Sequence, residues 1–242
     1  MRKAAPLLAS LFLLPFWVCA QTPTASTTDA SASGGQKTVE EKRLQSGVEV
    51  QVIASLVAEN DRASKKKALD LVRDMIDKGK TTDQNLDVVT LLDELGGEGT
   101  TKQVVQNRRV INDFPDIRRE AAELLGQIGG NQAREALLKI AQSDKEPMVV
   151  SEAVYSLGEI GGGDQAARVQ SVITNLVREQ DIIRPDSNFA FAAASALEML
   201  GKKTDGKVSP DVFAALIRIQ NGNYIRPVRE KAKQVLEEFT KY

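Results

Sequence analysis

The sequence predicts an all-α fold, a right-handed solenoid of stacked helix pairs. One helix ending recurs along the chain, as LLDELGG (91–97), LLGQIGG (124–130) and SLGEIGG (156–162). Apolar residues precede each ending at helical spacing, and a further helical run follows it. A single helix pair cannot bury its own apolar face. Pairs that recur along a chain therefore stack on one another and form a continuous core.

The first helix of each pair carries its apolar residues on one face. A leucine occupies the second position of the ending in five copies, and a small apolar residue stands four positions earlier. Spacings of three and four residues place these side chains on the same side of a helix. The predicted core columns are Leu92, Leu125, Leu157, Leu197 and Leu236, and Val88, Ala121, Ala153, Ala193 and Ala232.

Glycine follows the last apolar position in four of the five copies, at Gly96, Gly129, Gly161 and Gly201. Helices commonly end at a residue in the left-handed conformation, which glycine adopts without a Cβ clash. We therefore expect each of these glycines to end its helix and to let the chain turn back.

Second helices are predicted between the copies, over residues 100–112, 131–142, 164–180 and 209–220. Residues 47–59 and 62–78 predict one further pair that departs from the regular period. The sequence shows no strand pattern, so the GGGD segment at 161–164 is interpreted as a turn between helices and not as a phosphate-binding loop.

The segments PDIRREAAELLGQIGG (115–130) and PMVVSEAVYSLGEIGG (147–162) resemble the short HEAT-like repeats of the phycobilin-lyase type. The resemblance extends over 83–114 and 186–240 and fades before residue 80. It implies a helical solenoid of a kind found in phycobilin lyases, in deoxyhypusine hydroxylase and in many non-enzymatic scaffolds. The hydroxylase holds iron through His-Glu pairs, and this chain contains no histidine, so that activity does not carry over.

The first twenty residues resemble a secretory signal peptide. Arg2 and Lys3 precede a short apolar run, and Val18 and Ala20 fit cleavage before Gln21. Cleavage before an acylated Cys19, which would give a membrane-anchored lipoprotein, and an uncleaved interfacial anchor are the alternatives. Residues 21–40 predict a flexible Ser/Thr/Ala/Gly-rich linker, and residues 41–242 the HEAT-like solenoid. All but the anchor imply an exported protein, either periplasmic in a bacterium or secreted.

The composition limits the kinds of partner and of active site that the chain can have. The formal net charge is −1, with 32 basic and 33 acidic side chains, and nucleic-acid binders usually carry a clear basic excess. The only cysteine lies in the leader, so histidine and cysteine are both absent from the predicted mature chain. We therefore expect no metal site built on these residues, no cofactor and no catalytic residues. Acid–base chemistry by paired carboxylates stays formally open.

Outward positions of the second helices form a basic and polar column when the helices are aligned on their apolar residues. The predicted protein-binding residues are Arg134, Lys139, Asn175, Arg178, Phe213 and Arg218. We expect them to line a concave face that binds an acidic or extended protein segment, with Phe213 as an aromatic anchor. Tyr155 and Tyr224 are either contact aromatics or core packing.

A cluster of arginines on and before the first helices has two interpretations. Arg108, Arg109, Arg118, Arg119 and Arg229 either pair with carboxylates of neighbouring repeats or form a basic patch for an acidic partner. The charge balance of the chain favours pairing.

Together these features predict an exported, non-catalytic scaffold that binds another protein. It would contact a membrane only if Cys19 is lipidated. Two alternatives remain open, namely a lyase-like enzyme or enzyme subunit that acts on a bound small molecule, and an envelope-structural protein that binds glycan. An intracellular pigment substrate, which a phycobilin lyase requires, conflicts with export.

Overall fold

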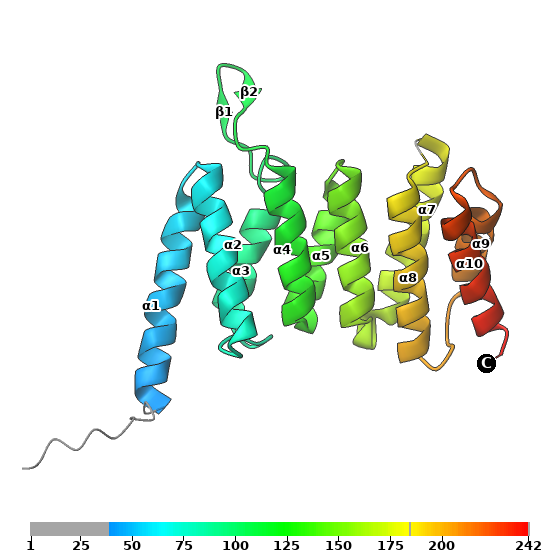
Figure 1. Cartoon of the computed structure of the whole chain (residues 1–242), viewed down its shortest axis with the longest axis horizontal. Helices are drawn as coiled ribbons and strands as arrows, with labels where there is room; N and C mark the ends of the chain where they lie inside the picture. Colours follow the sequence, from blue (N-terminus) through cyan, green and yellow to red (C-terminus); the bar gives the residue numbers. More distant parts are fainter. Residues whose placement is uncertain (1–38, 184, 242) are drawn as a thin grey trace, which may run out of the picture. The chain divides into compact units, whose positions relative to one another are not determined.

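Ten α-helices and one β-hairpin build the part of the chain that the computed structural model describes, residues 39–183 and 185–241 (Figure 1). The helices are α1 (Val39–Ala58), α2 (Arg62–Asp77), α3 (Leu86–Gly96), α4 (Pro115–Ile128), α5 (Gly130–Ser143), α6 (Pro147–Ile160), α7 (Ala166–Ile183), α8 (Ser187–Lys203), α9 (Pro210–Asn221) and α10 (Arg226–Phe239). A short 3-10 turn, Gly163–Gln165, precedes α7.

The helices form two layers. Helices α2, α4, α6, α8 and α10 pack side by side in the first layer, and α1, α3, α5, α7 and α9 pack in the second (Figure 1). Each helix also packs against its partner in the other layer, so consecutive pairs stack as repeats. The prediction of an all-α solenoid of stacked helix pairs is confirmed.

The leader and nearly all of the linker predicted from the sequence lie outside the described residues. Helix α1 begins at Val39, two residues before the predicted start of the solenoid. Among the described residues, no helix combines the length and the apolar character that a membrane crossing needs.

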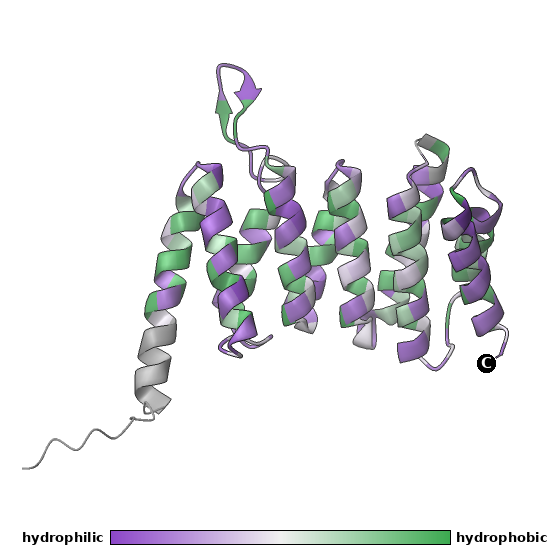
Figure 2. Cartoon of the chain, viewed as in Figure 1, coloured by the Kyte–Doolittle hydropathy of each residue, from purple (hydrophilic) through white to green (hydrophobic). Residues whose placement is uncertain are grey.

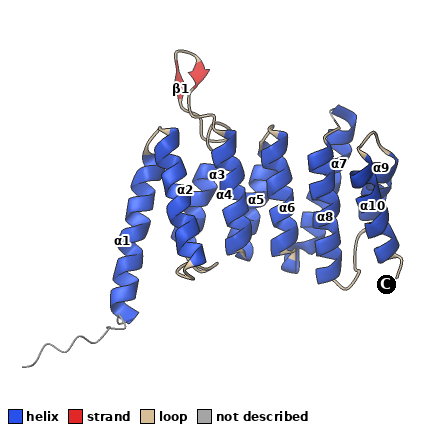
Figure 3. Ribbon diagram, in the orientation of Figure 1, coloured by secondary structure: helices blue, strands red, loops and turns tan. Residues whose placement is uncertain are grey.

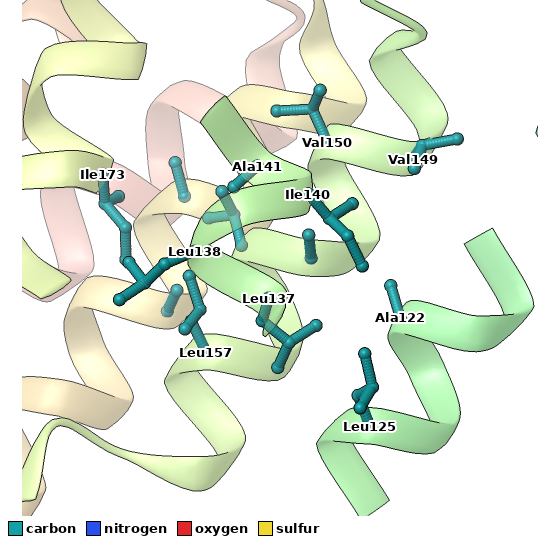
Figure 4. Packing of buried hydrophobic residues seen from close by; sticks show 14 of the residues in the cluster. Ala122, Leu125, Leu137, Leu138, Ile140, Ala141, Val149, Val150, Leu157 and Ile173 are labelled. Carbon is teal, nitrogen blue, oxygen red and sulfur yellow. The ribbon is translucent and has the colours of Figure 1, made fainter. Parts of the chain in front are cut away.

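The predicted core columns are buried between the layers. Leu92, Leu125, Leu157 and Leu197 are fully inaccessible to solvent, and Leu236 near the chain end is half-buried against the same core. The column of small residues is also buried. Figure 4 shows Leu125 of α4, Leu137 and Ile140 of α5 and Leu157 of α6 pointing toward a common interior. Small side chains let neighbouring helices approach closely: a Cβ added at Gly158 of α6 would lie 2.6 Å from the Ala196 Cα of α8.

The recurring glycines have two different functions. Gly129 (φ 75°, ψ −164°) and Gly161 (φ 83°, ψ 169°) end their helices at positive φ, in an extended region that only glycine occupies readily and not in the left-handed helical region expected from the sequence. Gly96 and Gly201 do not have positive φ, so the predicted conformation is wrong for these two. Helix α3 does end at Gly96, whereas α8 continues past Gly201 to Lys203. Both glycines make room for neighbours instead, because an added Cβ would collide with Ile140 at Gly96 and with Phe239 at Gly201.

Residues 100–112 do not form the predicted helix. They form turns and a hairpin in which β1 (Val105–Gln106) pairs antiparallel with β2 (Arg109–Val110), drawn in red in Figure 3. Asn107 and Arg108 make the connecting turn at φ 50° and 63°. Two positive φ values in a two-residue loop match the turn that joins twisted strands. The β-branched residues on both sides of Asn107 favour strands, but their spacing also fits a helix, and the sequence pattern therefore predicts a helix.

The hairpin changes the register of the repeats. Because no helix follows α3 before α4, α3 itself packs in the second layer beside α5, and α2 takes the place next to α4 in the first layer. The sequence aligns LLDELGG and LLGQIGG as equivalent helices, but α3 lies in the second layer and α4 in the first. Leu92 is nevertheless buried as predicted. A helix of either layer buries one apolar face, so the local pattern does not distinguish the layers.

Candidate protein-binding surface

An apolar groove crosses three neighbouring helices of the first layer, α6, α8 and α10. Its volume is about 510 Å³. The lining residues are Met148, Ser151, Glu152 and Tyr155 of α6, Ser187, Asn188, Phe191 and Ala192 of α8, and Ile225, Pro227 and Val228 at the start of α10.

Large apolar side chains are exposed in this groove. Met148, Tyr155, Phe191 and Ile225 are 48%, 38%, 44% and 59% exposed, and they are four of the twelve large apolar side chains that the described residues leave exposed. Met148 and Tyr155 are seven residues apart and so share one face of α6. Figure 2 shows the apolar middle of α8 between its hydrophilic ends. Gathered exposed apolar side chains of this kind mark interaction sites on soluble proteins.

Polar groups border the groove and fix its ends. The Ser151 hydroxyl donates to the Pro147 carbonyl at 2.6 Å, which satisfies it within α6. The backbone N–H of Ile225 donates to the Ser187 hydroxyl at 3.4 Å and ties the start of α10 to the start of α8. The groove is thus held by contacts between consecutive repeats.

A carboxylate with little compensation lies in the groove wall. Burial raises the pKa of the Glu152 carboxyl, Arg119 lowers it from 3.4 Å, and the nearby Glu123 and Glu159 raise it further, so that the net shift is upward. The ionised form of Glu152 is therefore destabilised in the free protein. A cation placed beside it would relieve this destabilisation.

Two of the residues predicted to form the binding column do not face outward. Arg134 is 5% exposed, and its guanidinium donates to the Gly161 carbonyl at 2.9 Å and to Asn131 Oδ1 at 2.6 Å. Arg134 thereby satisfies the Gly161 carbonyl, which has no hydrogen-bond donor within α6 because the helix has ended. Phe213 is half-buried and packs edge-on against Phe239, with ring centroids 6.1 Å apart, so it is a packing residue and not an exposed anchor.

The other four predicted residues are exposed on the second layer. Lys139 of α5 forms an ion pair with Asp93 at 3.0 Å, and Arg178 donates to Asn175 at 2.8 Å on α7. Arg218 is exposed on α9. The three helices are neighbours in the second layer. A basic and polar strip formed by these residues, and its role in binding, stay predictions.

The arginine cluster divides between the two interpretations. Arg118 is buried and pairs with Asp113 and Asp144, each at 2.6 Å, and Arg119 pairs with Glu152. Pairing is confirmed for these two. The side chains of Arg108 and Arg109 are exposed and have no hydrogen-bond or ion-pair partner among the described residues. The two tyrosines also differ, since Tyr155 lines the groove and Tyr224 is buried.

The groove itself was missed by sequence reasoning. Met148 and Phe191 occupy positions of α6 and α8 outside the predicted core columns, and a large apolar residue at such a position was the available signal. Within the described residues, no cluster of histidine, cysteine, aspartate and glutamate is placed to hold a metal ion.

Comparison with known proteins supports the repeat interpretation. Residues 106–184, about a third of the chain, match the family described as HEAT repeats. The match spans the two consecutive helix pairs α4–α5 and α6–α7. No curated protein matches the chain. The match and the stacked helix pairs together support HEAT-like repeats in this part of the all-α solenoid.

Proposed function

We propose that this protein is an exported, non-catalytic scaffold that binds a segment of another protein in the groove across α6, α8 and α10. HEAT repeats in general suggest a protein-binding helical scaffold. The observation that carries the choice of surface is the gathering of Met148, Tyr155, Phe191 and Ile225 in one groove. Complete burial of a fully exposed side chain of this kind contributes about 1.5–3 kcal/mol, and since these four are about half exposed, a partner would gain about half of that from each.

The chemistry of the groove specifies the bound segment. Aliphatic or aromatic side chains of the partner would pack against Phe191 and Met148, and a lysine or arginine would lie beside Glu152. This differs from the acidic partner expected for the strip on the second layer. The raised pKa of Glu152 supports the choice, because a partner cation would stabilise the ionised carboxylate that the free protein stabilises poorly.

Export is part of the proposal and rests on the leader pattern of residues 1–20. No feature of the described residues favours the lyase-like or glycan-binding alternatives over protein binding.

Site-specific photo-crosslinking in the native host tests the proposal. A photoreactive phenylalanine analogue at Phe191 should crosslink to a discrete protein, and the crosslinked peptide should contain apolar residues next to a basic one. Ile217 on α9 is the matched control, because it is 48% exposed on the second layer. If a discrete partner crosslinks from Ile217 and not from Phe191, the binding surface lies on the second layer and the proposal is wrong.

Substitutions provide a second test of which layer carries the binding surface. Phe191→Asp should weaken binding of the crosslinked segment by about tenfold or more, since it replaces an apolar anchor by a carboxylate that loses its hydration when the apolar side chains of the partner pack against it. A Lys139→Glu, Arg178→Glu, Arg218→Glu variant should bind that segment as the wild type does. Loss of binding in the triple variant alone would support the strip predicted from the sequence.

A further inference from the structure

The hairpin at residues 103–111 extends beyond the helix ends between α3 and α4 (Figure 3). Arg108 in its turn and Arg109 at the start of β2 are both exposed and have no ion-pair partner among the described residues. The segment QVVQNRRVI contains no carboxylate, so these two charges are locally uncompensated. Other described arginines with exposed side chains, such as Arg62, Arg168 and Arg226, form an ion pair.

The turn holds Arg108 at a conformational cost. Its φ is 63°, and the second residue of such a turn is most often glycine, because a side chain at positive φ is strained. Asn107 at the first position, with φ 50°, is a usual choice. A glycine at 108 would relieve the strain, and the arginine therefore has no advantage that derives from the turn itself.

The base of the hairpin is rigidly anchored. Asn112 is fully buried, accepts from the Val104 N–H at 2.8 Å and donates to the Lys102 carbonyl at 2.7 Å and to Glu98 Oε2 at 2.6 Å. Glu98 in turn pairs with Lys65 of α2. A buried polar network therefore fixes the direction in which the hairpin projects. A preorganised element loses little conformational entropy when it binds.

The hairpin also exposes apolar surface. Val105 and Val110 are directly opposite in the ladder, so their side chains share one face, and they are 60% and 38% exposed. The next pair, Gln106 and Arg109, points to the opposite face. The hairpin thus presents the valine pair on one face and Arg109 on the other, with Arg108 in the turn between them.

We infer that the hairpin is a second protein-contact element, which binds an extended acidic segment of a partner. Charge complementarity identifies the occupant, because guanidinium groups bind carboxylates in bidentate fashion. The valine pair offers apolar contact on the face opposite Arg109, to a segment that passes over the turn. This surface is separate from the groove, and the inference does not depend on what the groove binds.

A defined peptide tests the inference. A short fluorescein-labelled peptide of alternating glutamate and valine should bind the whole protein, as measured by fluorescence anisotropy, and more weakly as salt is added. An Arg108→Glu, Arg109→Glu variant should weaken binding by at least about tenfold, because two attractive charges become repulsive. The control variant Lys67→Glu, Lys207→Glu changes the net charge equally at two exposed lysines and should bind within about twofold of the wild type.

Arg108→Gly distinguishes a binding role from a structural one. It should raise the midpoint of thermal unfolding, because glycine removes the strain at positive φ. It should still weaken binding of the acidic peptide, because one guanidinium group is lost. Equal binding by the wild type and the doubly reversed variant would overturn the inference. Equal binding of a lysine–valine peptide would overturn it too, as would a preference for phosphatidylglycerol vesicles over the acidic peptide.

Discussion

Lys65 Nζ lies 2.8 Å from Glu98 Oε1, and the two side chains are only 1% and 2% exposed. The ammonium also donates to the Val57 carbonyl at 2.8 Å, and the second Glu98 oxygen accepts from Asn112. One buried ion pair thus joins α1, α2 and the segment that leads to the hairpin. Desolvation makes such a pair costly to break, since the remaining partner becomes an uncompensated buried charge.

Lys65→Met should therefore destabilise the protein by about 3–5 kcal/mol, measured by urea denaturation. Lys67→Met is the control, because Lys67 is exposed two residues further along the same helix, and its effect should stay within about 0.5 kcal/mol. Adding Glu98→Gln to Lys65→Met should restore part of the loss. A Lys65→Met variant as stable as the wild type would show that the pair is not buried in solution.

Leu125→Ala should cost about 2–5 kcal/mol of unfolding free energy, because the fully buried Leu125 side chain leaves a cavity between α4 and α5. The midpoint of urea unfolding measures the loss. An unchanged midpoint would contradict the placement of this leucine column in the core.

Gly129→Ala should destabilise through the backbone alone. No atom lies within 4 Å of an added Cβ, so the cost, about 1–3 kcal/mol, comes from φ 75° and ψ −164°. Gly47 in α1 is the matched control: it also has open space, but its φ is not positive. Gly47→Ala should raise stability by about 0.5–1 kcal/mol, since alanine is the better helix former. Effects of the same sign at both sites would contradict the assigned conformation.

Two glutamates should respond to pH in opposite directions. Burial and nearby carboxylates raise the pKa of Glu152 above the ordinary 4.5, so its ionisation destabilises the folded state as pH rises through the raised pKa. Glu152→Gln should therefore stabilise at neutral pH, and this gain should vanish below about pH 4.5.

Glu198 provides the contrast. Burial raises the pKa of its carboxyl, but hydrogen bonds from Lys231 and Lys202 outweigh this effect, and the net pKa is lowered below 4.5. The folded state gains stability from ionised Glu198 above the unfolded pKa and loses it as pH falls through the lowered folded value. Glu198→Gln should destabilise at neutral pH and become neutral in strong acid. Chemical denaturation across the pH range, with both variants, measures the two trends, and identical trends would refute the assignment.

The mature protein should begin at Gln21. Val18 and Ala20 satisfy the cleavage rule, and Val18 disfavours acylation of Cys19. Sequencing of the N-terminus after purification from the native host decides the question. A diacylated cysteine at the N-terminus would instead make the protein a membrane-anchored lipoprotein.

The helices and the core were predictable because each depends on local spacing. Leu125 and Ala153 occupy the buried face that a period of 3.6 residues assigns to them. The layer of α3 was not predictable, because it depends on whether residues 100–112 supply a helix, and a short hairpin with few strand residues has a weak local signal. The prediction that Arg134 is exposed was wrong for a related reason. Its position on α5 is fixed by periodicity, but its burial depends on the Gly161 carbonyl of the next repeat.

The groove could not have been located from one repeat, since Met148, Phe191 and Ile225 come from three successive repeats. This origin has a mechanical consequence. In a stack where each pair touches only its neighbours, a small rotation between pairs accumulates into curvature. The spacing of the three side chains changes with that curvature, so a segment bound across them would act as a splint. Binding would stiffen the array, and bending the array would release the segment.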